Sequence, residues 1–127
     1  MICDKNYLKF DNKYKLEKTI NSISKEDIKF LMQLSSKYEI QRLNALFAHT
    51  VPIDSDNYFY PNSNYSIFDK TDKKYIFIGH THYPQFISYY EKKIINPGSV
   101  SQPRDNLKKS SFIIADENFE RIEFIRL

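Results

Sequence analysis

All three histidines of this chain follow short apolar runs. His49 comes directly after residues 46–48, and His80 and His82 come two and four positions after the end of residues 75–78. Short, wholly apolar runs are typical of strands that are buried on both faces of a sheet. In open α/β sheets, ligands bind beyond the carboxyl ends of the strands. Neutral imidazole is the commonest nitrogen ligand for Zn, Mn and Fe, so these histidines form a candidate metal site.

A structural role is the competing explanation for each histidine. A histidine at a strand end is often simply hydrogen-bonded to the backbone, and for one such residue that is the more common case. Three histidines at two strand ends, with none elsewhere in the chain, favour the metal site instead. His80 and His82 flank Thr81 at an expected turn and could reach two ions that lie close together.

Glycine is unusually scarce. The chain of 127 residues has only Gly79 and Gly98, whereas glycine makes up about 7% of average chains. We therefore expect each glycine to occupy a backbone position that no other residue can adopt. For Gly79, the expected role is to let the backbone turn freely ahead of His80.

One helix has a clear start signal. Ser24 is a candidate N-cap with Asp27 three residues on, the pattern of a capping box. The apolar residues that follow have helical spacing and predict a stripe packed in the core: Ile28, Leu31, Met32 and Leu34. Residues 12–22 predict a weaker helix before it.

The remaining segments predict strands and turns. We expect a half-buried strand over 38–43, buried strands at 46–48 and 75–78, a loop over 52–64 with a short helix at 63–70, a hairpin of 85–90 and 93–95, a loop at 96–99, and a hairpin of 111–115 and 119–127. No repeat or linker interrupts them. The pattern predicts one α/β domain over residues 1–127, with two layers of sheet.

Composition excludes several classes of protein. The net charge of +3 is mild and the lysines are spread along the chain, which favours solvated surface over nucleic-acid binding. No run approaches the ~18 apolar residues that span a bilayer. Asp4 and Lys5 interrupt any leader-like apolar run, so a cytoplasmic location is expected. The single cysteine, Cys3, rules out an internal disulfide framework and is most simply inert.

At this point the motifs match a family. "GHTH" at 79–82 and "NPGSVSQPRD" at 96–105 resemble the C-terminal half of calcineurin-like metallophosphoesterases, and most closely their small bacterial phosphodiesterases. "LFAHT" at 46–50 resembles the upstream histidine motif of that family. The helical segment at 22–40 resembles the usual segment ahead of that motif. The likeness covers most of the chain in the family's order.

The resemblance implies a two-layer β-sandwich flanked by helices, with a dinuclear centre of Mn, Zn or Fe at the strand ends. By it, His49 and His80 bind one ion and His82 binds the other. The two ions hold the phosphate ester substrate and activate water for in-line attack on phosphorus. The resemblance assigns no catalytic side chain in this chain beyond these ligands.

The resemblance also gives roles to the segment after the histidine turn. Asn96 and Gly98 would shape a loop beside the metal site. Arg104 would face the phosphate, although an exposed arginine in a salt bridge is an equally good interpretation of that residue.

Three motifs of the family's first half cannot be found. An Asp-x-His pair needs a fourth histidine, and a Gly-Asp or Gly-Asn pair needs a further glycine. "MICD" at 1–4 is the nearest remnant of the third motif, with Ile2 in place of the asparagine ligand. Thr50 also follows His49 where the family usually has glycine. The sequence therefore predicts a partial sandwich that lacks the N-terminal half of the domain.

This interpretation has consequences for activity and assembly. With three imidazoles and no carboxylate, we expect weak metal binding and little or no hydrolysis by this chain alone. The strands at 46–48 and 75–78 are expected to expose edges and apolar faces. A separate N-terminal half chain or a homo-oligomer could cover them.

Two alternatives remain open. The chain could be a non-catalytic interaction or scaffold module that kept the fold and lost the metal centre. Intact histidines and an intact "NPGS" loop argue against that, since a relaxed site has no physical need for them. The motifs could also match by chance in an unrelated globular domain.

Overall fold

The computed structural model describes residues 16–51 and 58–127, and the chain divides into two compact units after Ser35. Each unit is described by itself below. The expectation of one domain over residues 1–127 stays a prediction. Expectations for Ile2, Cys3, residues 12–15 and residues 52–57 lie outside the described residues.

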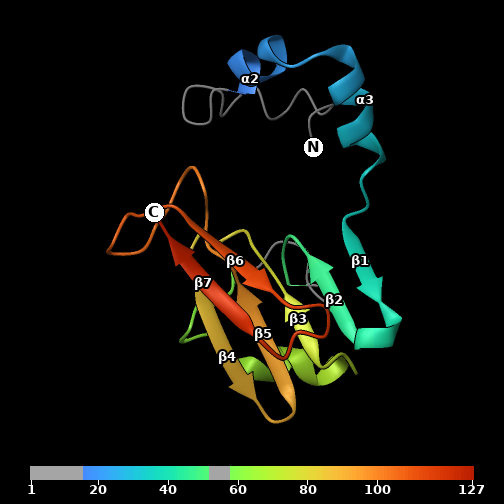
Figure 1. The fold of residues 1–127 in the computed structure, drawn as a ribbon, viewed down its shortest axis with the longest axis vertical. Helices are drawn as coiled ribbons and strands as arrows, with labels where there is room; N and C mark the ends of the chain where they lie inside the picture. Colours follow the sequence, from blue (N-terminus) through green and yellow to red (C-terminus); the bar gives the residue numbers. More distant parts are fainter. Residues whose placement is uncertain (1–15, 52–57) are drawn as a thin grey trace. The chain divides into compact units, whose positions relative to one another are not determined.

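The first unit contains helices α2 (Leu16–Ser22) and α3 (Lys25–Gln33) (Figure 1). Ser24 caps α3 as expected: its hydroxyl accepts the Asp27 N–H at 3.0 Å, and the Asp27 carboxylate accepts the Ser24 N–H at 3.2 Å. These two bonds satisfy backbone donors that the first turn leaves without an intrahelical partner. The predicted capping box is confirmed.

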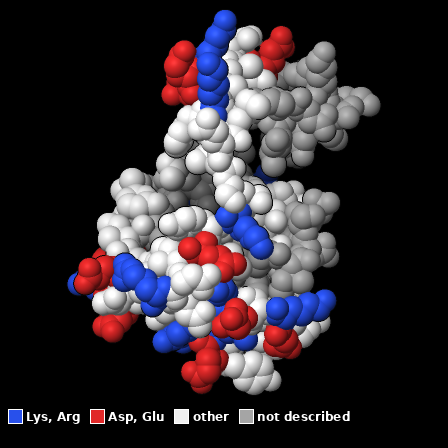
Figure 2. Space-filling model, turned by 90° about the vertical axis from the view of Figure 1, so that its right-hand side faces the viewer, with Lys and Arg blue, Asp and Glu red and all other residues white. Residues whose placement is uncertain are grey.

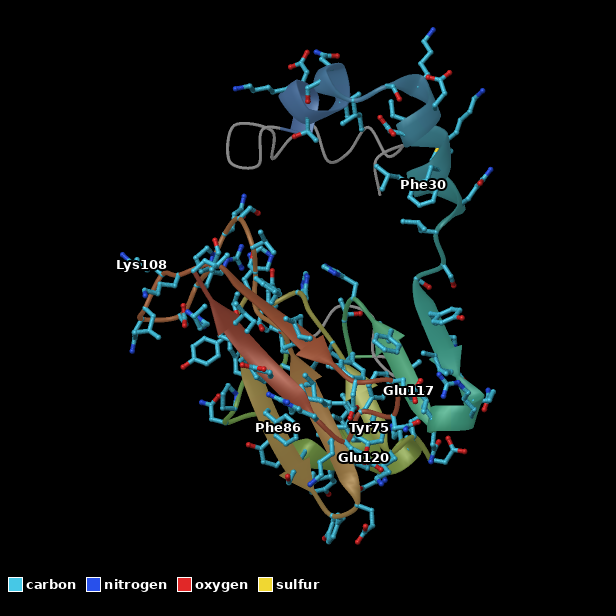
Figure 3. All side chains as sticks on the ribbon, viewed as in Figure 1. Phe30, Tyr75, Phe86, Lys108, Glu117 and Glu120 are labelled. Carbon is cyan, nitrogen blue, oxygen red and sulfur yellow. The ribbon has the colours of Figure 1, made fainter. Side chains whose placement is uncertain are left out.

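The core role predicted for the α3 stripe is wrong. No residue of α3 is buried, and the exposed fractions of the stripe are 40% for Leu31, 61% for Met32 and 56% for Leu34. The neighbouring Phe30, labelled in Figure 3, is 61% exposed. Helical periodicity identifies which face of a helix is apolar. It does not show whether a surface covers that face.

The second unit is built on a five-stranded sheet with the order β1-β2-β3-β5-β4 (Figure 1). Its strands are β1 (Lys37–Ile40), β2 (Ala45–Ala48), β3 (Tyr75–Phe77), β4 (Gln85–Tyr89) and β5 (Lys92–Asn96). The central strands β2, β3 and β5 are parallel, and β1 and β4 flank them antiparallel. The expectation that β2 and β3 expose edges is therefore wrong, because β1 and β5 pair with their outer sides.

The connection from β1 to β2 also differs from expectation. Leu43, predicted to belong to the first strand, lies in the short 3-10 helix η2 (Gln41–Leu43). Asn44 then adopts a left-handed conformation with φ 49°, which reverses the chain into β2. Asparagine tolerates this region better than most residues, so the turn falls where its side chain allows it.

The two faces of the sheet carry separate apolar rows. Strand register aligns Leu46, Ile76, Ile94 and Ile87 on one face. The three isoleucines of this row pack with Phe59 and with Phe68, which is fully buried in the 3-10 helix η3 (Tyr65–Lys70). The predicted short helix at 63–70 is thus confirmed in position, as a 3-10 helix.

A hairpin forms the second layer on the opposite face. Strands β6 (Ser111–Ala115) and β7 (Ile122–Arg126) lie in front of the sheet in Figure 1. Phe119, in the turn between them, packs its ring edge-on against Phe77 at 5.0 Å, Tyr75 at 5.4 Å and Phe47 at 6.1 Å. Figure 3 labels Tyr75. The predicted mixed α/β architecture with two layers of sheet is confirmed.

A partly exposed ion pair joins β1 to the segment before β3. The ammonium of Lys73, which is only 8% exposed, lies 2.9 Å from the Glu39 carboxylate and also donates to Gln41. The hydrogen bond from Lys73 lowers the pKa of Glu39 below its usual value, against an opposing effect of burial. On the face drawn in Figure 2, acidic and basic side chains of this unit are interspersed. No helix in the described residues is long and apolar enough to cross a bilayer.

Candidate metal site

The predicted site lies where three parallel strands end at one edge of the sheet. His49 follows β2, Gly79 and His80 follow β3, and Asn96 is the last residue of β5. The Gly79 N–H donates to the His49 carbonyl at 3.0 Å, which continues the pairing of β2 with β3 past the strand ends. His80 and Asn96 lie 31 and 47 positions after His49 along the chain. They reach the same edge of the sheet because the strands that carry them are parallel and adjacent.

His49 and His80 face each other through ring nitrogens. His49 Nε2 lies 3.3 Å from His80 Nδ1, and the two ring planes are inclined by 71°. Two nitrogens that bind one tetrahedral ion at about 2.0–2.1 Å lie about 3.4 Å apart. The observed spacing therefore fits two ligands of one ion. The same contact is a hydrogen bond when one ring carries the shared proton.

His82 is oriented by a different contact. Its Nδ1 lies 2.9 Å from the Gln102 carbonyl oxygen. A carbonyl can only accept, so Nδ1 carries the proton and Nε2 of a neutral ring is left as an acceptor. A metal-binding histidine commonly makes this kind of bond through its second nitrogen. Within residues 16–51 and 58–127, however, no three His, Cys, Asp or Glu side chains form a metal-binding group.

The backbone of the histidine turn is strained at the histidines. His80 has φ 67° and His82 has φ 58°, and a left-handed conformation costs about 1–2 kcal/mol for a residue with a Cβ. Strain of this kind is concentrated at functional sites, where the surrounding contacts maintain it. The turn's unusual conformation is thus not in Gly79, where the sequence pattern predicted it.

Gly79 has a different role from the one expected. A Cβ at this position would lie 3.4 Å from the His49 carbonyl oxygen and 3.6 Å from His49 Nδ1. Those distances are ordinary contacts, so the position does not exclude alanine. The expectation that only glycine can occupy the position is therefore wrong for Gly79. It is correct for Gly98, which has φ 85° and has no room for a Cβ.

Asn96 ties the histidine turn to the glycine loop. Its side chain is fully buried, and its Nδ2 donates to the Gly79 carbonyl and to Thr81 Oγ1, both at 2.9 Å. Its Oδ1 accepts the Gly98 N–H at 2.9 Å. Thr81 is also fully buried and lies between the two histidines of the turn. One amide therefore holds the backbone on both sides of the candidate ligands.

We expect Asn96→Ala to destabilise the protein by about 2–4 kcal/mol, because two acceptors and one donor lose their partner inside the fold. Urea unfolding followed by circular dichroism measures this loss. Asn106→Ala, at an exposed loop position, is the matched control, and we expect it to change stability by less than about 0.5 kcal/mol. An equal loss of unfolding free energy in the two variants would contradict the role given to Asn96.

Arg104 is exposed, and the contact that fixes its position comes from its backbone. Its N–H donates to the His82 carbonyl at 3.2 Å. The next residue, Asp105, pairs with Arg126 at 2.5 Å and anchors the loop on β7. The guanidinium of Arg104 makes no ion pair with the described residues, so its role toward phosphate stays a prediction.

Sequence reasoning missed one neighbour of the site. The Tyr58 ring stacks on the His80 ring, with 4.2 Å between centroids and 27° between planes. Tyr58 lies in the loop before η3, and residues 58–64 follow the loop prediction. The sequence did offer a signal, which is the pair Tyr58 and Tyr60 in a segment rich in Asp, Asn and Pro. No strand is expected in that segment, so these aromatic residues are not explained by core packing.

Comparisons with known proteins were made with the whole chain. Residues 12–118 match the calcineurin-like phosphoesterase superfamily domain. An uncharacterized protein of Methanocaldococcus jannaschii is 32% identical over 149 residues, which cover 99% of this chain and 60% of that protein. The chain thus spans about 60% of the length of this curated relative.

Two solved structures share the fold. A metallophosphoesterase from Sphaerobacter thermophilus is similar with a TM-score of 0.75 and 24% identity, over 88% of this chain and 56% of that chain. A hypothetical protein from Pyrococcus horikoshii is similar with a TM-score of 0.68 and 18% identity, over 91% of this chain and 47% of that one.

Proposed function

The chain belongs to the calcineurin-like phosphoesterase superfamily, and from this membership we propose that it carries the histidine ligands of a metal-dependent phosphodiesterase site. The observation that supports the proposal most strongly is the 3.3 Å spacing of His49 Nε2 and His80 Nδ1 at the ends of adjacent parallel strands. That spacing suits two nitrogen ligands of one ion.

The proposal assigns one metal-binding nitrogen to each histidine. His49 Nε2 and His80 Nδ1 would hold one divalent ion (Mn, Zn or Fe), and His82 would bind a second through Nε2. Bound divalent ions supply positive charge against the phosphate oxygens and the acidity that makes water a nucleophile. The bond from His82 Nδ1–H to the Gln102 carbonyl fixes the tautomer that this requires.

The neighbouring residues position these ligands. Asn96 holds the carbonyl and hydroxyl groups on either side of His80. Gly98 lets the loop pass close to β6, which sets the path of the chain toward Gln102. Arg104, whose backbone is bonded to the His82 carbonyl, is proposed to supply its charge to the phosphate.

The chain's own ligands leave the site incomplete, in our proposal. Neutral imidazoles cannot offset the charge of two divalent ions, and carboxylates normally do so. No Asp or Glu joins the histidines in a group of three or more among the described residues. We propose that the remaining ligands come from an N-terminal half, on a separate chain or on a longer one. A homodimer would bring only the same side chains twice.

Mn²⁺-dependent hydrolysis of bis(p-nitrophenyl) phosphate tests this proposal. The chain alone should show no turnover above background, and turnover should appear when an N-terminal half of the family domain is added. His82→Ala should abolish that complemented turnover. Turnover by the chain alone that is lost in His82→Ala would mean that this chain completes the site by itself, and the half-site proposal would be wrong.

The exposed stripe of α3 favours a second candidate function, an interaction or scaffold module. Phe30 is 61% exposed and Leu34 is 56% exposed. Exposed apolar surface of this kind often marks a contact with another protein. The two candidates differ in metal affinity: a pure interaction module should bind Mn²⁺ no better than His82→Ala does.

A further inference from the structure

Strand β1 forms one edge of the five-stranded sheet (Figure 1). It pairs with β2 on one side, and within residues 16–51 and 58–127 no strand pairs with its other side. Its four residues include neither proline nor glycine, so nothing in their backbone prevents a further strand from pairing there. Tyr38, inside β1, is 65% exposed. We call the outer side of residues 37–39 the open edge.

The hydrogen bonds of β2 show which backbone groups of β1 face outward. The Asn44 carbonyl accepts a hydrogen bond from the first residue of β3 at 3.1 Å. The Ala45 N–H belongs to the same trans peptide and therefore points the opposite way, toward β1. Ala45 lies opposite Ile40, so this pair and every second pair along the ladder are the hydrogen-bonded ones. The N–H and C=O groups of Lys37 and Glu39 consequently point away from β2, along the open edge.

We propose that β1 pairs with β1 of a second copy of this chain, antiparallel and about a two-fold axis at Tyr38. In this arrangement Lys37 of each copy lies opposite Glu39 of the other. Both residues have outward backbone groups, so they form the hydrogen-bonded pairs of the new ladder. The two Tyr38 residues form the closer pair between them. The dimer goes beyond the proposed function and does not depend on a bound metal.

Charge selects this register over the neighbouring ones. Outward-facing residues must oppose one another, so a two-fold axis on the open edge lies at residue 37, 38 or 39. An axis at Lys37 or at Glu39 sets two like charges directly opposite, which is destabilising. An axis at Tyr38 sets unlike charges opposite on both sides. Charges on an edge strand usually oppose pairing with another chain, whereas this alternation makes the edge complementary to itself, as a two-fold interface requires.

Tyr38 extends an aromatic row that already crosses the sheet. It lies opposite Phe47, whose ring stacks on the Phe77 ring with 4.4 Å between centroids and 3° between planes. Residues that lie directly opposite each other point to the same face of a sheet, and aromatic pairs across strands are stabilising. In the dimer, the two Tyr38 side chains therefore meet on this face and the row continues from one copy to the other.

Disulfide trapping of the full chain tests the register, in a background where Cys3→Ser removes the only native thiol. Tyr38→Cys places two thiols directly opposite each other at the axis, where a disulfide can form. In the same register the two copies of Lys37→Cys have Cα atoms more than about 7 Å apart, too far for a disulfide. Tyr38→Cys should therefore form a linked dimer in a glutathione redox buffer about tenfold faster than Lys37→Cys.

Tyr90→Cys is the control for chance encounters between exposed thiols, because Tyr90 is 83% exposed and follows β4. The proposal is overturned if Tyr38→Cys forms linked dimer no faster than Tyr90→Cys. It is equally overturned if Lys37→Cys is linked as fast as Tyr38→Cys, because the strands would then not pair about Tyr38.

Sedimentation velocity over a concentration series tests the dimer without a cross-link. The wild-type chain should form a reversible dimer, and Lys37→Glu should raise its dissociation constant about tenfold, because like charges then lie opposite twice. Lys37→Arg should retain the dimer, and so should Lys109→Glu, which makes the same charge change in an exposed loop. Glu39 is left unchanged because it pairs with Lys73 of its own chain. A wild-type chain that sediments only as a monomer, or equal weakening by Lys37→Glu and Lys109→Glu, would overturn the proposal.

Discussion

Gly98→Ala is expected to destabilise the protein by about 3 kcal/mol or more, while Gly79→Ala should cost no more than about 1 kcal/mol. At Gly98 the backbone has φ 85°, and a Cβ would lie 2.9 Å from the Ser111 Cβ and 3.2 Å from Pro84. The backbone strain and the overlap with β6 therefore both contribute to the loss of stability in Gly98→Ala. The comparison uses the only two glycines in the chain.

Urea unfolding of both variants measures this difference. Gly98→Ala should lower the unfolding midpoint sharply, because the loop must move away from β6 and pull on Asn96, which bonds the Gly98 N–H. Gly79→Ala meets its nearest atoms at 3.4 Å or more. If the two variants lost equal stability, the left-handed conformation and tight packing at Gly98 would not be the cause.

His49→Ala is expected to weaken Mn²⁺ binding by at least about 100-fold. Removing a residue that only hydrogen-bonds to a metal ligand commonly lowers metal affinity about 10–100-fold, and removing the ligand itself should cost more. The free Mn²⁺ signal in electron paramagnetic resonance measures this directly. The wild-type affinity itself should be weak, since no carboxylate joins the histidines among the described residues. His80→Ala should match His49→Ala, because both nitrogens are proposed to hold one ion.

His82→Ala provides the internal comparison for that measurement. Its ring is held by Gln102 and not by the other two histidines, so its loss should affect a separate ion and leave the His49–His80 ion bound. Identical binding curves for wild type and His49→Ala would refute the ligand assignment. Mn²⁺ binding by the Asn106→Ala control should equal that of the wild type.

The strands and caps were largely predictable because their signals are local. The capping box at Ser24 and Asp27 follows from two residues three apart, and the hairpins at β4–β5 and β6–β7 follow from apolar alternation around polar turns. The approach of His49 to His80 was also predictable, since it depends only on parallel strands ending at one edge, whereas His82 contacts the Gln102 carbonyl instead. His49 and His80 meet at that edge as expected.

Errors arose where the outcome depends on what surrounds a residue. The α3 stripe is apolar and helical, yet its exposure depends on whether another surface covers it. Gly79 was expected to let the backbone turn ahead of His80, whereas the left-handed residues of the turn are His80 and His82, and Asn96 and the Gln102 carbonyl bond to this turn. Long-range hydrogen bonds of this kind leave no local signal in the sequence.

The pairing of strands was beyond sequence reasoning for the same reason. Nothing local indicates that β1 protects β2, or that β5 rather than β4 pairs with β3.

Long-range ¹H–¹⁵N NMR of the histidine rings during titration with Zn²⁺ tests the central claim most directly, and only three rings contribute to the spectrum. The account predicts that His49 Nε2 and His80 Nδ1 shift together, with one stoichiometry, while His82 Nδ1 stays protonated against the Gln102 carbonyl. Shifts of His49 and His80 at different zinc concentrations, or no shift in either, would contradict the claim that they share one ion.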